Sequence, residues 1–197
     1  ESEPSSEVGR VMSEAEILSA AEERMKNVIE STRRDLAAIR TGRANPALLD
    51  RVQVEYYGTL TPLKQLATVS APEPRLLLIQ PFDKNAVKAI ERAILQSDLG
   101  FTPTTDGHVV RITVPELTEE RRKELVRLAR KTAEEKRVAI RNLRREANER
   151  VRAAQKDGEL SEDEARRLEE KIQQLTDRYV GEVDRLLEAK ERDILEV

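Results

Sequence analysis

The fold is decided by residues 118–152, which read TEERRKELVRLARKTAEEKRVAIRNLRREANERVR. Apolar or small side chains recur in this stretch every three or four residues, which predicts one long amphipathic helix with a narrow apolar seam. Thr118 followed by two glutamates is a typical helix start, and Asp157-Gly158 predicts an end near Gln155. The seam consists of Leu125, Ala129, Thr132, Ala139, Ile140, Leu143, Ala147 and Val151.

Two further segments have the same helical period. Ser13 with Glu16 and Ser161 with Glu164 match capping boxes, so helices are expected to start there. The first helix is expected to end near Arg40, before Thr41-Gly42, and only a short turn separates the last two helices. Three seams of similar length predict an antiparallel three-helix bundle. The two further seams are Leu18, Ala21, Met25, Val28, Thr32, Leu36 and Ile39, and Ala165, Leu168, Ile172, Leu175, Tyr179, Val183 and Leu186.

The segment from Ala44 to Val114 differs from its flanks, because apolar residues alternate with polar ones or form short runs. Strands are predicted around residues 52–56, 66–71, 76–80 and 109–114, with a turn at residues 72–74 and a helix that starts after Asp83. The fold class is therefore α+β. A discontinuous bundle domain, residues 12–41 and 115–197, carries an inserted β/α/β domain, residues 42–114. Only two segments of the chain, near residues 40–44 and 114–116, connect the two domains. This predicts an elongated molecule with a two-stranded hinge.

Composition narrows the possible functions. The 197 residues are 37% charged and 3% aromatic, as expected for long helices that bury little surface, and the net charge is only -3. The absence of cysteine excludes disulfides, thiolate zinc sites and cysteine nucleophiles. No apolar run approaches the roughly 20 residues of a membrane helix. Residues 1–11 are polar and aperiodic, so a disordered tail is expected there.

The charge is unevenly distributed. Residues 121–152 contain thirteen basic and five acidic side chains, whereas residues 157–197 contain seven basic and fourteen acidic ones. The bases are mostly arginines, whose planar forks fit phosphate, and a solvent-facing stripe of them predicts a surface that follows nucleic-acid phosphates. The alternative is a solvated face with salt bridges to the acidic last helix. The arginines expected opposite the seam are Arg127, Arg130, Arg137, Arg141, Arg144, Arg145 and Arg152.

No catalytic constellation emerges. His108 is the only histidine and lies beside a predicted hairpin turn. Acidic pairs such as Asp163 and Glu164 lie on charged helix faces, where solvation is the usual role. Tyr56 and Tyr57 are expected to supply one core ring and one surface ring. The sequence contains no glycine-rich phosphate loop. We therefore expect a protein that is not an enzyme and uses neither a metal nor a cofactor.

Several motifs resemble those of ribosome recycling factors, in the same order and from about Met12 to Val197. They are Ile39-Arg40-Thr41-Gly42-Arg43-Ala44-Asn45-Pro46, Val54-Glu55-Tyr56-Tyr57-Gly58, Ser97-Asp98-Leu99-Gly100, Leu117-Thr118-Glu119-Glu120-Arg121-Arg122-Lys123 and Arg141-Asn142-Leu143-Arg144-Arg145.

The resemblance implies an L-shaped molecule in which the bundle binds large-subunit ribosomal RNA (rRNA) of the post-termination ribosome. Elongation factor G, a GTPase, would then use GTP to drive the subunits apart. A monomer without a membrane partner is expected. It would work in the bacterial cytoplasm, or in the plastid stroma or another organelle interior.

The resemblance also assigns roles to residues. The residues that would bind rRNA are Arg40, Arg141, Arg144 and Arg145. We add Arg130 and Arg137 because the periodicity places them on the same stripe. The hinge would consist of Thr41, Gly42, Arg43, Val114 and Pro115, with Glu116 standing where a second proline is expected. Two other functions stay open from the residues alone. One is a coiled-coil adaptor for protein helices, and the other is a general RNA-binding protein without a splitting role.

Overall fold

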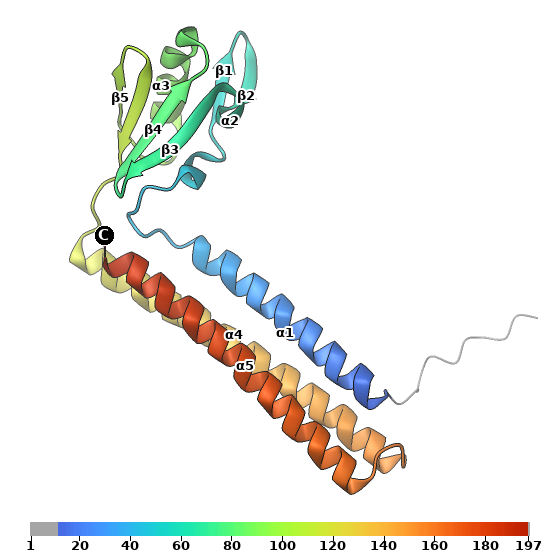
Figure 1. Cartoon of the computed structure of the whole chain (residues 1–197). Coiled ribbons are helices and arrows are strands. Elements are labelled where there is room, and N and C mark those ends of the chain that lie inside the picture. The colour runs from blue at the N-terminus through green and yellow to red at the C-terminus, as the bar shows by residue number, and fades with distance from the viewer. Residues whose placement is uncertain (1–11, 197) are drawn as a thin grey trace, which may run out of the picture. The chain divides into compact units, whose positions relative to one another are not determined.

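The computed structural model describes residues 12–196, so the tail expected over residues 1–11 lies outside the described residues. The described chain forms two compact units (Figure 1). The helical unit runs to Ile39 and continues from Glu124 to Arg192. The sheet unit contains Arg40–Lys123 and the residues from Asp193 onward. Long helices in one unit and antiparallel strands in the other confirm the α+β class.

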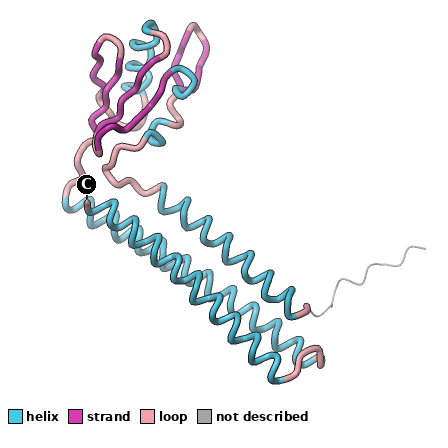
Figure 2. Tube along the Cα trace, in the orientation of Figure 1, coloured by secondary structure: helices cyan, strands magenta, loops and turns pink. Residues whose placement is uncertain are grey.

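The helical unit is a bundle of three long helices. Figure 2 shows them running alongside one another, and a short turn after α4 reverses the chain into α5. This confirms the three-helix bundle. The helices are α1 (Glu14–Ala37), α4 (Glu119–Lys156) and α5 (Glu162–Leu195).

Helix α1 begins as the capping box predicts, because the Ser13 hydroxyl accepts a hydrogen bond from the Glu16 backbone N–H at 3.3 Å. The helix ends at Ala37 rather than near Arg40. Its seam also differs from the prediction, since Leu18 and Val28 are only partly buried. Ile17 and Ile29 take the buried positions that were predicted for their neighbours Leu18 and Val28, whereas the other predicted seam residues are buried as expected. The buried row is Ile17, Ala21, Met25, Ile29, Thr32 and Leu36.

Small side chains let α4 pack closely in the bundle. Its buried positions include four alanines, and Ala133 occupies the seam where Thr132 was predicted. Two buried threonines, Thr32 and Thr176, donate hydrogen bonds to carbonyl oxygens four residues earlier in their own helices, both at 2.7 Å. Their hydroxyls are therefore satisfied without a partner across the bundle.

The sheet unit holds a hairpin, a four-stranded antiparallel sheet and one principal helix. Strands β1 (Gln53–Tyr56) and β2 (Thr59–Pro62) form the hairpin. The order in the larger sheet is β3-β4-β6-β5. The other elements are the 3-10 turns Pro46–Leu49 and Lys84–Ala86, α2 (Leu63–Leu66), β3 (Ala67–Glu73), β4 (Leu76–Pro81), α3 (Val87–Gln96), β5 (Pro103–Asp106) and β6 (Val109–Thr113).

Helix α3 and the inner faces of the strands form a core separate from that of the bundle. Ile90 and Ile94 of α3 and Ile112 of β6 are fully buried in it. The structure confirms the strands predicted near β1, β3, β4 and β6, while β2 and β5 were not predicted. The turn predicted at residues 72–74 was wrong, because β3 continues to Glu73 and the turn follows it.

One side-chain hydrogen bond ties the hairpin to the start of α3. The Tyr56 hydroxyl donates to Asp83 Oδ2 at 2.6 Å, and Asp83 Oδ1 accepts from the Asn85 backbone N–H at 3.0 Å. The bond to Asp83 raises the pKa of Tyr56 to about 12, and the Tyr56 hydroxyl lowers the pKa of Asp83. As predicted for the tyrosine pair, Tyr57 is the surface ring, with 78% of it exposed.

Replacing Tyr56 by phenylalanine is expected to lower the thermal unfolding midpoint of the sheet unit near neutral pH. The difference from the parent protein should shrink in acid. The lowered pKa of Asp83 means that its contribution is present above the unfolded-state pKa and is lost as pH falls through the folded-state value. Unfolding curves followed by circular dichroism between pH 7 and pH 3 would test this. A difference that stayed constant over that range would show that the Tyr56–Asp83 bond is not its cause.

Candidate nucleic-acid interface

Helix α4 carries most of the predicted rRNA-binding residues on one rigid element of 38 residues. Its start is fixed by Thr118, whose hydroxyl accepts a hydrogen bond from the Arg121 backbone N–H at 3.1 Å. Its arginines do not form one stripe. They form two rows, which differ in the partners that hold them.

The first row faces α5 and consists of Arg130, Arg137 and Arg144. Arg130 Nε lies 2.7 Å from Glu191 Oε1, and Arg137 Nε lies 2.7 Å from Asp184 Oδ1. Both partners belong to α5, and the hydrogen bond to Glu191 raises the pKa of Arg130. Burial opposes the rise at Arg137, but the bonds outweigh it and its pKa is also raised. We call these three residues the inner row.

The prediction that the whole stripe faces away from the seam was wrong for Arg137 and Arg144. Arg137 lies three residues before Ile140, and Arg144 four residues after it, so both share the face of that buried side chain. Only 19% of the Arg137 side chain is exposed. The alternative, salt bridges to the acidic last helix, holds for Arg130 and Arg137.

The second row is exposed and points away from the buried seam. Its ionic and hydrogen-bonding contacts stay within α4: Arg141 Nη1 lies 4.0 Å from Glu134 Oε1, and Arg145 Nη1 donates to Asn142 Oδ1 at 3.0 Å. Within residues 12–196, no ion pair connects this row to α1 or α5. We call it the outer row, and its members are Arg127, Arg141, Arg145 and Arg152.

Arg40 was predicted to act with these arginines, but it belongs to the sheet unit. Its guanidinium carbon lies 5.6 Å from the centre of the Phe101 ring, which is a cation–π distance. Arg40 is therefore described with the sheet unit and is assigned to neither row.

The predicted hinge residues are held by local contacts inside the sheet unit. Thr41 Oγ1 accepts a hydrogen bond from the Arg43 backbone N–H at 3.3 Å. Gly42 has φ +76°, and a Cβ added there would lie 2.9 Å from Leu117 Cγ. The Val114 backbone N–H donates to the Arg75 carbonyl at 2.8 Å. The two connecting strands thus approach each other closely where only glycine fits.

Glu116 takes an ionic role at the position where a second proline was expected. Its two carboxylate oxygens lie 3.7 Å from Arg75 Nη1 and 3.6 Å from Arg122 Nη2. The second connecting segment is therefore held by ion pairs to two cationic side chains of the same unit. Both contacts were missed from the sequence, because Arg75 is distant from Glu116 along the chain and Arg122 lies inside α4.

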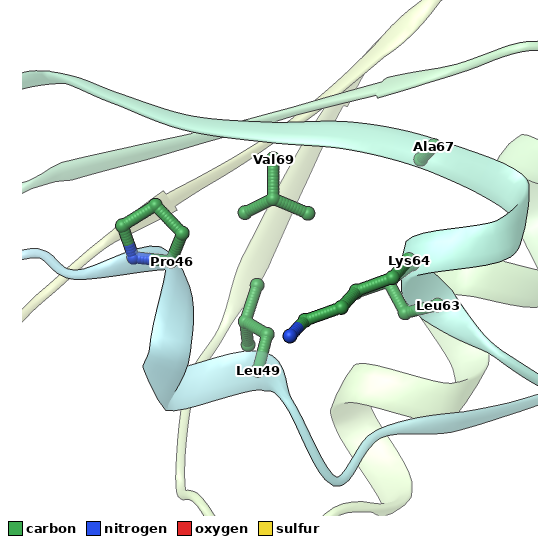
Figure 3. A pocket seen from close by; sticks show the side chains of 6 residues that line it. All are labelled: Pro46, Leu49, Leu63, Lys64, Ala67 and Val69. Atoms are coloured by element: carbon green, nitrogen blue, oxygen red, sulfur yellow. The ribbon is translucent and has the colours of Figure 1, made fainter.

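A small cleft in the sheet unit is mainly apolar. Its volume is about 230 Å³, and Figure 3 shows the side chains of Leu49, Leu63 and Val69 around it with Lys64 as the one ionisable group. Lys64 Nζ is paired with Asp50 at 2.9 Å. His108 is exposed in the turn between β5 and β6, as predicted. These residues do not combine a nucleophile with a general base.

Residues 12–196 hold neither a cluster of metal-ligating side chains nor a membrane-spanning helix. No three acidic or histidine side chains come together in a way that would hold a metal ion. None of the helices in this range combines the length and the apolar character that crossing a membrane requires.

Comparison with known proteins points to a single family. Residues 32–195 match the family model described as ribosome recycling factor. The ribosome-recycling factor of Halalkalibacterium halodurans is 58% identical over 182 residues, or 92% of this chain and 98% of the relative. That of Shouchella clausii is 59% identical with the same coverage.

Two solved structures are similar as well. A solution structure of the ribosome recycling factor has a TM-score of 0.71 and 46% identity, covering 95% of this chain and all of that one. The other describes the T. thermophilus ribosome recycling factor and E. coli elongation factor G bound to the E. coli post-termination complex. Its TM-score is 0.63 at 50% identity, covering 93% of this chain and all of the matched one.

Proposed function

Because the chain belongs to the ribosome recycling factor family, we propose that it binds large-subunit rRNA of the post-termination ribosome and splits the subunits with elongation factor G and GTP. The similar T. thermophilus factor is described on the post-termination complex together with elongation factor G, which supports both partners. In this proposal the GTPase hydrolyses GTP, and the chain itself acts as a monomeric lever rather than as an enzyme.

The outer row is the observation that carries the proposal. Arginines that have no acidic partner on α1 or α5 keep their forks available for the phosphates of a polyanion. The rigid helix fixes the spacing of those forks along the RNA backbone. Arg144 is included in the rRNA contact because its partner on α5, Gln173, is neutral, whereas Arg130 and Arg137 are paired with acids of α5 and are assigned to the α4–α5 interface. Arg40 is retained as a contact made from the sheet unit.

The lever requires a place where the chain can bend. We assign it to Thr41, Gly42, Arg43, Val114 and Pro115, and keep the domain boundaries at residues 41/42 and 114/115. The bundle would stay anchored while work delivered by the GTPase moves the inserted domain. Breaking contacts between the ribosomal subunits is the proposed output of that movement.

Sedimentation of purified post-termination ribosomes tests this function. Subunits should separate only when the protein, elongation factor G and GTP are all present, and omission of any one should leave intact ribosomes. A coiled-coil adaptor would fail to sediment with ribosomes at low salt. A general RNA-binding protein would sediment with them but would not increase splitting. Either result would replace the proposal by that alternative.

Replacing Gly42 by alanine is expected to destabilise the sheet unit by about 1–2 kcal/mol, because an L-residue is strained at φ +76° and its Cβ would meet Leu117. Splitting should slow more than ribosome binding weakens, since the outer row is untouched. Unfolding in urea and the splitting assay measure the two effects.

Gly100→Ala is the matched control for this prediction. Gly100 lies in the same unit with φ +72°, and nothing lies within 4 Å of an added Cβ. Any excess effect of Gly42→Ala therefore comes from Leu117, and Leu117→Ala in the same chain should reduce it. Equal losses in both glycine variants would remove the Leu117 contact from the explanation.

A further inference from the structure

The inner row faces a matching row of acids on α5. Arg130, Arg137 and Arg144 are spaced by seven residues, and so are Glu191, Asp184 and Asp177. Helices α4 and α5 are antiparallel, so a step of seven residues along α4 matches a step of seven in the opposite direction along α5. We call these facing rows of charges the ladder. At its first two positions, Arg130 with Glu191 and Arg137 with Asp184, the charges form direct ion pairs, each at 2.7 Å. The same register places Asp177 opposite Arg144.

The third position of the ladder is different because Gln173 stands between the two charges. Arg144 Nη1 donates to Gln173 Oε1 at 2.9 Å, and Gln173 Nε2 donates to Asp177 Oδ1 at 2.9 Å. No ion pair to Arg144 occurs within residues 12–196, and its buried Nε has no hydrogen-bond partner there. The Arg144 charge is therefore held by a neutral group, whereas Arg130 and Arg137 are held by carboxylates.

The chemistry of the three groups fixes the orientation of the amide. Arginine has only hydrogen-bond donors and an ionised carboxylate has only acceptors, so the Gln173 carbonyl must face Arg144 and its NH₂ must face Asp177. In this orientation both ends of the amide are satisfied. Gln173 consequently lies between the two charges and engages Oδ1 of Asp177.

We propose that Gln173 is a positioning residue that keeps Asp177 from neutralising Arg144 and so leaves this arginine available to rRNA phosphate. The inference rests on the proposed function, because it concerns how one rRNA contact is prepared. A carboxylate paired with the guanidinium would have to be displaced before phosphate could bind. The ladder thus divides one face of α4 into two structural arginines and one binding arginine.

Replacing Gln173 by leucine tests the inference. The variant removes both hydrogen bonds of the Gln173 side-chain amide, so Asp177 is expected to pair directly with Arg144. Affinity for purified ribosomes should fall roughly tenfold at about 0.1 M salt, the order expected when one charge-assisted contact is lost. Adding Asp177→Asn in the same chain should restore most of the affinity, because asparagine carries no charge. A crystal structure of Gln173→Leu should place an Asp177 oxygen within ion-pair distance of the Arg144 guanidinium.

The control is Gln174→Leu, the same substitution at the neighbouring exposed position of α5, which should bind ribosomes like the parent protein. Loss of affinity in Gln173→Leu without rescue by Asp177→Asn would mean a packing defect and would overturn the inference. Gln173→Glu provides a second route if the leucine variant is poorly folded. Its carboxylate would bind Arg144 directly, so unchanged affinity of that variant would also overturn the inference.

Arg144→Ala separates this inference from the proposed function. If Arg144→Ala weakens ribosome binding while Gln173→Leu does not, the positioning role fails and the rRNA contact stands. If Arg144→Ala binds ribosomes at unchanged affinity, the rRNA role of Arg144 fails and the inference fails with it. Splitting by the Arg144→Ala variant at saturating concentration then reports on the recycling function itself.

Discussion

Replacing Arg141 and Arg145 together by glutamine is expected to weaken ribosome binding roughly a hundredfold at about 0.1 M salt, or about tenfold for each lost charge-assisted contact. Both side chains belong to the outer row, and within residues 12–196 neither forms an ion pair or a side-chain hydrogen bond with α1 or α5. The bundle should therefore keep its stability while it loses affinity. Binding is measured by sedimentation with ribosomes over a range of salt concentrations, and stability by thermal unfolding.

Salt dependence distinguishes phosphate contacts from other contacts. Each phosphate neutralised by an arginine releases counterions, so the slope of log affinity against log salt should become shallower by about 2 for the double variant. An unchanged slope would mean that these arginines do not bind phosphate, even if the affinity fell.

Arg166→Gln combined with Arg178→Gln is the matched control. These two arginines are also exposed and also belong to the helical unit, but they lie on α5 and are paired with Asp163 and Glu22. The change in net charge is the same. Equal loss of binding in both double variants would indicate general attraction to a polyanion and would argue against a specific outer row.

The difference between the two rows shows what periodicity alone can and cannot predict. The period of α4 was clear from the sequence, yet it placed Arg137 on the wrong side. A face opposite the seam is defined only once the positions of both neighbouring helices are known, and α5 turned out to cover the flank that carries the inner row. The sequence did contain a usable signal, because acids recur every seven residues from Asp177 to Glu191 in step with the arginines of α4.

The strands show a second limit. Strands β4 and β6 were predictable because they bury continuous or alternating apolar residues in the core. Strands β2 and β5 have no fully buried residue, and each contains a proline, so they carry neither the alternation nor the composition typical of strands. They are strands because they pair with a neighbouring strand, and this pairing cannot be predicted from their own residues alone.

Local signals were more reliable at the ends of elements. The capping box at Ser161 forms in full, with the Ser161 hydroxyl accepting from the Glu164 backbone N–H at 3.1 Å and the Ser161 backbone N–H donating to Glu164 Oε1 at 3.3 Å. The Ser13 hydroxyl caps α1 in the same way. The Asp83 cap forms as well, although it starts a 3-10 turn that leads into α3. These features involve residues three or fewer positions apart, so their geometry depends little on distant parts of the chain.

The two hydrophobic cores lead to the other prediction with a large effect. Ile140 is fully buried among residues of α1, α4 and α5, and Ile90 is fully buried against the sheet. Replacing either by alanine is expected to cost about 2–5 kcal/mol in the unit that contains it. Since the cores share no residue, Ile140→Ala should speed hydrogen exchange in the bundle helices, while amides of β4 and β6 keep their protection.

The reciprocal variant makes the prediction stringent. Ile90→Ala should expose the sheet amides to exchange and leave the central turns of α4 and α5 protected. Val138→Ala is the control, because Val138 lies on α4 with 46% of its surface exposed and should change stability by about 0.5 kcal/mol at most. If either isoleucine variant accelerates exchange equally in both units, the chain unfolds as one cooperative body. In that case the inserted domain would have to move relative to the anchored bundle even though the two units unfold together.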